Sequence, residues 1–104
     1  MKTIMVVDDE LSILEKVKSF LKDEDLEIIT VENNRKALEF ISQDSEDNLG
    51  LILIDTELPE SKTPAFFSMK PQSKMNIDTS KKEDFLQKPF TKDELRNFIM
   101  KKLD

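Results

Sequence analysis

An apolar run at residues 49–54 that stops at Asp55 constrains the fold more than any other feature. A strand that is apolar at every position, and not only at alternate ones, is typical of a parallel sheet covered by helices on both faces. Residues 3–7 form a similar β-branched run and lead directly into Asp8 and Asp9. The sequence therefore predicts two buried strands with carboxylates at their carboxyl ends.

Strand and helix patterns alternate along the rest of the chain. Residues 10–22 and 35–43 carry apolar side chains at helical spacing, and Thr91 with Glu94 forms a capping-box pattern before a last helix. Two further strands are predicted at residues 26–31 and 84–87. This alternation indicates one α/β domain over residues 1–104, with a doubly wound parallel sheet.

Composition excludes several kinds of chemistry and partner. The formal net charge is −6, so no basic surface is expected for nucleic acid. The chain has no cysteine and no histidine, which leaves only a hard cation held by oxygen as a candidate metal. No apolar run approaches the ~20 residues of a membrane helix, and the N-terminus lacks a signal-peptide pattern. We therefore expect a cytoplasmic protein without a membrane partner.

Four charged residues are expected to meet at one edge of the sheet. Asp8 and Asp9 follow the first strand, Asp55 the third, and Lys88 the last. Ligand sites in such sheets lie at the carboxyl ends of the strands, where the first and third strands are neighbours. Clustered carboxylates favour Mg²⁺, and a lysine beside them can contact a phosphate oxygen. Simpler interpretations are that the acids cap a helix and that Lys88 is a solvated side chain.

The motifs around these residues resemble the signature of response-regulator receiver domains. They are Val7-Asp8-Asp9-Glu10, then Leu53-Ile54-Asp55 with Pro59 four residues on, and Phe85-Leu86-Gln87-Lys88-Pro89-Phe90. The resemblance covers the first ~60 and the last ~20 residues. It implies a flavodoxin-like strand order, 2-1-3-4-5. It also implies a cis peptide bond before Pro89 and a mobile aromatic side chain at Phe85.

The resemblance assigns a role to each residue of the cluster. Asp55 is implied to accept a phosphoryl group from a histidine kinase or a histidine phosphotransfer protein, with Mg²⁺ as cofactor. Asp8, Asp9, Asp55 and the backbone carbonyl of Glu57 are implied metal ligands. Lys88 is implied to contact the phosphoryl group. Such a domain signals to an unknown downstream protein and is not an enzyme with a separate substrate.

The segment before Phe85 is too short for the complete family pattern. Only residues 60–84 separate Pro59 from Phe85, whereas two helices and a strand of average length need about 27 residues before any loops. In the preferred alignment, residues 65–69 form the fourth strand, Ser68 is the switch hydroxyl and the third helix is missing. In the alternative, Pro64 opens a third helix, residues 75–79 form the strand with Thr79 or Ser80 as the switch, and the fourth helix is lost.

The shortened segment also leaves a second function open. The usual output surface of receiver domains includes the fourth helix, so this surface is expected to be incomplete. The chain is then either a stand-alone phosphoacceptor domain or a degenerate receiver that binds partners without phosphorylation. A homodimer is one form that the second function could take, because a missing helix can expose an apolar face.

Overall fold

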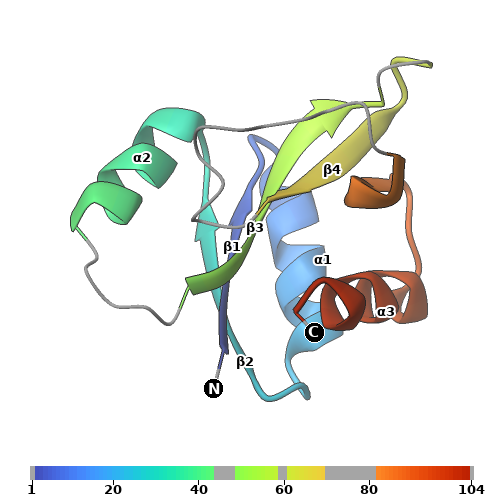
Figure 1. Ribbon diagram of the computed structural model, residues 1–104, viewed down its shortest axis with the longest axis horizontal. Helices are drawn as coiled ribbons and strands as arrows, with labels where there is room; N and C mark the ends of the chain where they lie inside the picture. The colour runs from blue at the N-terminus through green and yellow to red at the C-terminus, as the bar shows by residue number, and fades with distance from the viewer. Residues whose placement is uncertain (1, 44–48, 59–60, 70–81, 104) are drawn as a thin grey trace.

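The computed structural model describes residues 2–43, 49–58, 61–69 and 82–103 and has an α/β architecture. One five-stranded sheet, in the order β2-β1-β3-β4-β5, lies between helices (Figure 1). In chain order the elements are β1 (Lys2–Val7), α1 (Leu11–Leu21), β2 (Leu26–Val31), α2 (Asn34–Gln43), β3 (Leu49–Glu57), β4 (Pro64–Met69), the 3-10 helix η2 (Lys82–Asp84), β5 (Phe85–Gln87) and α3 (Lys92–Leu103).

The sheet is mixed and not parallel throughout. Strand β1 pairs in parallel with β2 and β3, but β4 is antiparallel to both β3 and β5. The prediction of an all-parallel sheet is therefore wrong for β4. The predicted strand order agrees with the observed one, so the difference lies only in the direction of this strand.

The short connection between β3 and β4 explains the reversed strand. Parallel neighbours need a crossover of about a dozen residues or more, whereas antiparallel neighbours need only a hairpin. Here Leu58 donates its N–H to the carbonyl of Thr63 at 2.9 Å, and Lys62 turns the chain with a φ of 54°. No helix fits between β3 and β4, as the preferred alignment predicted. Pro64 begins a strand and not a helix, so the alternative alignment is wrong at this point.

The hairpin also lengthens β3. The strand continues past Asp55 to Glu57 because Thr56 pairs with Ala65 and Glu57 pairs with Pro64. The sequence pattern predicted an end at residue 54, where the apolar run stops. Pairing with β4 extends the strand through three polar residues, and Asp55 therefore lies within a strand and not in the loop after it.

Two apolar layers hold the sheet and the helices together. Helices α1 and α3 cover one face (Figure 1), where residues such as Val6, Val17, Leu53 and Ile99 are fully buried. Helix α2 packs on the other face through Ala37 and the partly buried Phe40. Because successive side chains of a strand point to opposite faces, β1 and β3 contribute to both layers. This double burial fixes the register of the strands that carry the acids.

Side chains cap the N-termini of α2 and α3 but not that of α1. Thr91 and Glu94 form the predicted capping box, with reciprocal side-chain-to-backbone bonds of 2.9 and 3.1 Å. Asn33 accepts the N–H of Lys36 at 2.9 Å and caps α2. Helix α1 begins after Glu10 without a side-chain cap, so Asp8 and Asp9 do not serve that purpose. None of the described helices has the length and apolar character that crossing a membrane requires.

Candidate functional site

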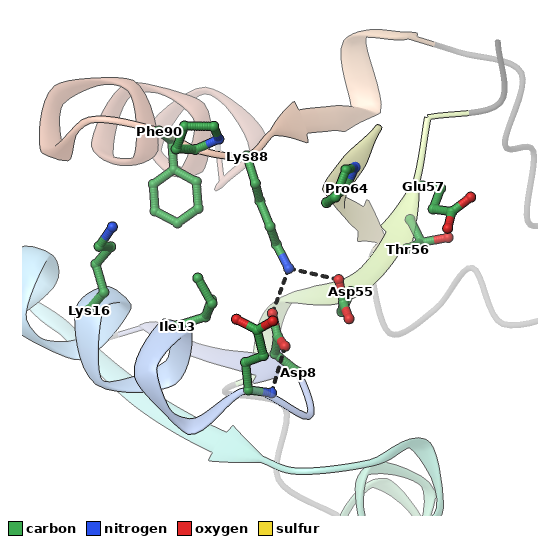
Figure 2. A pocket seen from close by; sticks show the side chains of 11 residues that line it. Asp8, Ile13, Lys16, Asp55, Thr56, Glu57, Pro64, Lys88 and Phe90 are labelled. Carbon is green, nitrogen blue, oxygen red and sulfur yellow. Dashed lines mark hydrogen bonds and ion pairs between the residues drawn. The ribbon is translucent and has the colours of Figure 1, made fainter. Parts of the chain in front are cut away.

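Lys88 links two carboxylates at the edge of the sheet where β1 ends. Its ammonium nitrogen lies 2.6 Å from Asp8 Oδ2 and 2.7 Å from Asp55 Oδ1 (Figure 2). The Lys88–Pro89 peptide bond is cis, as the family resemblance implies, and it follows the short strand β5. Three segments far apart in the sequence therefore bring their charges to one point, as the sequence predicted.

Asp8 is the buried anchor of the cluster. Its side chain is only 1% exposed, and both of its oxygens accept hydrogen bonds. Oδ2 accepts from Lys88, and Oδ1 accepts the backbone N–H of Glu10 at 2.9 Å. A buried carboxylate without partners would be costly, and these two donors satisfy it. The orientation of Asp8 is therefore fixed before any ligand binds.

Lys88 is held in its charged form. Burial alone lowers the pKa of its ammonium group, because a low dielectric disfavours charge. The hydrogen bonds to Asp55 and Asp8, together with the attraction of both carboxylates, outweigh burial and raise the pKa above its ordinary value. The ammonium also lies 4.5 Å from the centre of the Phe66 ring. Lys88 is thus a fixed positive charge in the neutral pH range.

The acids of the cluster could hold a divalent cation. Asp8, Asp9 and Asp55 each place a carboxylate oxygen within 4.8 Å of the others. Such a set of oxygen donors fits a hard ion, and Mg²⁺ commonly uses one or two carboxylates and keeps several waters. Asp9 and Asp55 are exposed enough to meet a hydrated ion. Glu57 lines the neighbouring cleft, and the role of its backbone carbonyl as a ligand stays a prediction.

Two hollows share the carboxylates of Asp8 and Asp55. A cleft of about 760 Å³ opens on the side of Lys88, with Ile13, Lys16 and Phe90 along its wall (Figure 2). A smaller hollow of about 210 Å³ lies on the side of Asp9, next to the residues that lead into α2. Asp55 is the more exposed of the two carboxylates, at 35% against 1% for Asp8, and it can therefore be approached from either hollow.

The structure does not bring Ser68 to this cluster. In the antiparallel β4, Ser68 lies opposite Leu53, and Phe66 is the residue opposite Asp55. The Ser68 side chain is buried and its hydroxyl donates to the backbone carbonyl of Asp84 at 3.1 Å. The expected placement as a switch hydroxyl is therefore corrected, because it assumed a parallel strand. The alternative candidates, Thr79 and Ser80, lie outside the described residues.

The reversal also changes which residues border the site. Pro64, the first residue of β4, lines the cleft where a parallel strand would end (Figure 2). Phe85, the expected mobile aromatic, is 8% exposed. Its ring centre lies 5.1 Å from that of Phe67, on the face of the sheet opposite to Phe66. The sequence analysis placed Phe66 in a strand and gave neither Phe66 nor Pro64 a role in the site. The shortness of the connection before Pro64 was the signal that could have identified both.

Comparison with known proteins adds no family assignment. No protein-family model matches the chain, and no solved structure matches it significantly. The fold and the site define an α/β protein with a lysine-bridged carboxylate cluster at the carboxyl edge of β1 and β3.

Proposed function

We propose that the chain is a receiver domain that accepts a phosphoryl group on Asp55 from the phosphohistidine of a histidine kinase or histidine phosphotransfer protein. The observation that supports this most strongly is the Lys88 ammonium between Asp8 and Asp55, with Asp9 beside them. Phosphoryl transfer requires mainly positioning and neutralisation of charge, and these groups provide both. We further propose that the fold is a flavodoxin-like variant in which the fourth strand is reversed.

The proposed transfer uses Asp55 as the nucleophile. A carboxylate oxygen of Asp55 attacks the phosphorus atom, and the P–N bond of the donor breaks. The electron pair of that bond stays on the imidazole nitrogen, and the ring leaves as neutral imidazole when its other nitrogen carries a proton. The product is an acyl phosphate on Asp55. No proton needs to be taken from the nucleophile, which suits a site without histidine.

The neighbouring residues stabilise the charge that this step moves. Lys88 exchanges its contact with Asp55 for a phosphoryl oxygen while it keeps the buried Asp8 as counter-ion. Asp8 and Asp9 would hold Mg²⁺, which when bound neutralises negative charge on the carboxylates and on the phosphoryl group. Because Asp8 is already oriented by the Glu10 N–H, the site needs little rearrangement.

The test is phosphorylation by a small donor. The protein is incubated with Mg²⁺ and acetyl phosphate, and its intact mass is measured over time. We expect one phosphoryl adduct on the wild type and none on Asp55→Asn, nor after chelation of Mg²⁺. The matched control is Asp25→Asn, an identical change at an exposed position just before β2. An adduct on Asp55→Asn, or none on the wild type, would refute the proposal.

A second candidate function is a degenerate receiver that acts as a binding or dimerisation module. The observation in its favour is that β4 places no hydroxyl at the site, so a phosphoryl group on Asp55 lacks the usual partner from this strand. This candidate predicts association that is the same with and without phosphodonor. Light scattering over a range of concentrations tests it, and a monomer at every concentration would exclude the dimer. For either candidate we propose a cytoplasmic location.

A further inference from the structure

Phe66 lies beneath Lys88, the only cation that contacts Asp8 and Asp55 among the described residues. Its ring centre is 4.5 Å from the Lys88 ammonium nitrogen, and the side chain is completely buried. We propose that Phe66 is a positioning residue, whose ring face holds the ammonium between Asp8 and Asp55 through a cation–π interaction. The consequence for phosphoryl transfer rests on the function proposed above, but the contact itself can be tested separately.

The Phe66 ring provides the stabilisation of the ammonium charge that water provides for an exposed lysine. An ammonium group has three N–H donors, and two of them in Lys88 point to Asp8 and Asp55. The side chain is only 12% exposed, so little water reaches the remaining part of the charge. A cation over an aromatic face is attracted to the negative potential of the ring, and this attraction grows when the cation is desolvated. The ring thus stabilises the charge without occupying an N–H donor.

Phe66 is well fixed for this purpose. It pairs with Asp55 on one side and with Leu86 on the other, so the nucleophile and the ring share one register of the sheet. Its ring centre lies 5.8 Å from that of Phe90, which is itself buried and follows Lys88 by two residues. The aromatic neighbour and the two strands leave Phe66 little freedom. The reversed direction of β4 is what puts an aromatic side chain opposite the nucleophile.

A ring face suits a lysine that has to change partners. An oxygen acceptor in the same place would fix one N–H in one direction. A ring attracts the cation over a broad area, so the ammonium can shift from Asp55 toward a phosphoryl oxygen without losing this contact. Weakening the negative potential of the ring should loosen the position of the ammonium, so that it is less often in place for the phosphoryl oxygen. Phosphorylation should then be slower even when the shape of the core is unchanged.

The experiment replaces Phe66 by mono-, di- and trifluorophenylalanine, which keep the ring shape and progressively weaken its negative face. Phe67 receives the same series as the matched control, because it is the next residue of β4, points to the opposite face and packs on Phe85. We expect the rate of acetyl-phosphate modification to fall stepwise at Phe66, by about three- to thirtyfold at full fluorination. We expect less than about a twofold change at Phe67.

A second measurement separates this proposal from the proposed function. The hydrogen-exchange rate of the Lys88 ammonium, followed by nitrogen NMR without phosphodonor, should rise with fluorination of Phe66 and stay constant with fluorination of Phe67. If the wild type takes no phosphoryl group, the proposed function fails and this exchange rate alone decides the role of Phe66. The proposal would be overturned if fluorination at Phe66 changed neither the hydrogen-exchange rate of the Lys88 ammonium nor the rate of acetyl-phosphate modification, whatever the thermal stability of the variants.

Discussion

Replacing Lys88 by methionine should destabilise the protein strongly, because it removes the charge that compensates a buried carboxylate. Asp8 is 1% exposed and would keep only the N–H of Glu10. Breaking a buried ion pair by removing one partner costs about 3–5 kcal/mol. Asp55 is 35% exposed and can regain water, which places the expected loss near the lower end, at about 3 kcal/mol. Methionine keeps most of the aliphatic stem, so the loss reports charge more than packing.

The assay is guanidinium unfolding in metal-free buffer at neutral pH, followed by far-UV circular dichroism because the chain has no tryptophan or tyrosine. A loss of 3 kcal/mol lowers the melting temperature of a domain of this size by about 12–24 °C. Lys18→Met is the matched control, since Lys18 is exposed on α1, and it should change stability by no more than about 0.5 kcal/mol. Equal losses for the two variants would refute the reasoning that Lys88 compensates Asp8. Saturating Mg²⁺ should recover part of the loss, because the cation replaces the missing charge.

Three further predictions concern the pH dependence of stability, the Ser68 hydroxyl and the turn between β3 and β4. The raised pKa of Lys88 means that its pairing contributes fully below the ordinary value of 10.5 and is lost as pH rises through the folded-state pKa. The difference in unfolding free energy between wild type and Lys88→Met should therefore narrow above about pH 10.5, and a constant difference up to about pH 12 would contradict this. Ser68→Ala should cost about 1 kcal/mol by removing the bond to Asp84 but leave the rate of phosphorylation unchanged, and a slower rate would place Ser68 in the site after all. Lys62→Asn should raise the melting temperature by about 2–4 °C, because asparagine tolerates the φ of 54° better than lysine, whereas no rise would mean that the turn is unstrained.

The existence of most elements followed from patterns that are local in the sequence. Apolar runs predicted the buried strands at residues 3–7 and 49–54, and helical spacing predicted α1. The capping box at Thr91 marked the start of α3 to within a residue. These signals are reliable because burial and hydrogen bonding act on neighbouring residues in the same element.

The direction of β4 did not follow from such patterns. A run of apolar residues has the same periodicity in either direction, so residues 65–69 predicted a strand but not its orientation. Connection length decides the direction, and the sequence analysis assigned the shortage of residues to a missing helix without reversing the strand. The wrong expectation for Ser68 and the missing role for Phe66 both follow from the assumption that β4 is parallel. The acids and Lys88 were placed correctly because β1, β3 and β5 keep the expected directions.

The contact between Asp8 and Lys88 closes a loop of 80 positions in a chain of 104 residues. The loss of chain entropy makes closure of such a loop unfavourable by about 4 kcal/mol of free energy. For the short β3–β4 turn the corresponding free energy is less than half of this value. The hairpin can thus form early, but the charged cluster can form only when both ends of the chain have docked. The fraction of molecules with an intact cluster consequently measures the fraction in which β1, β3 and the segment after β5 have come together.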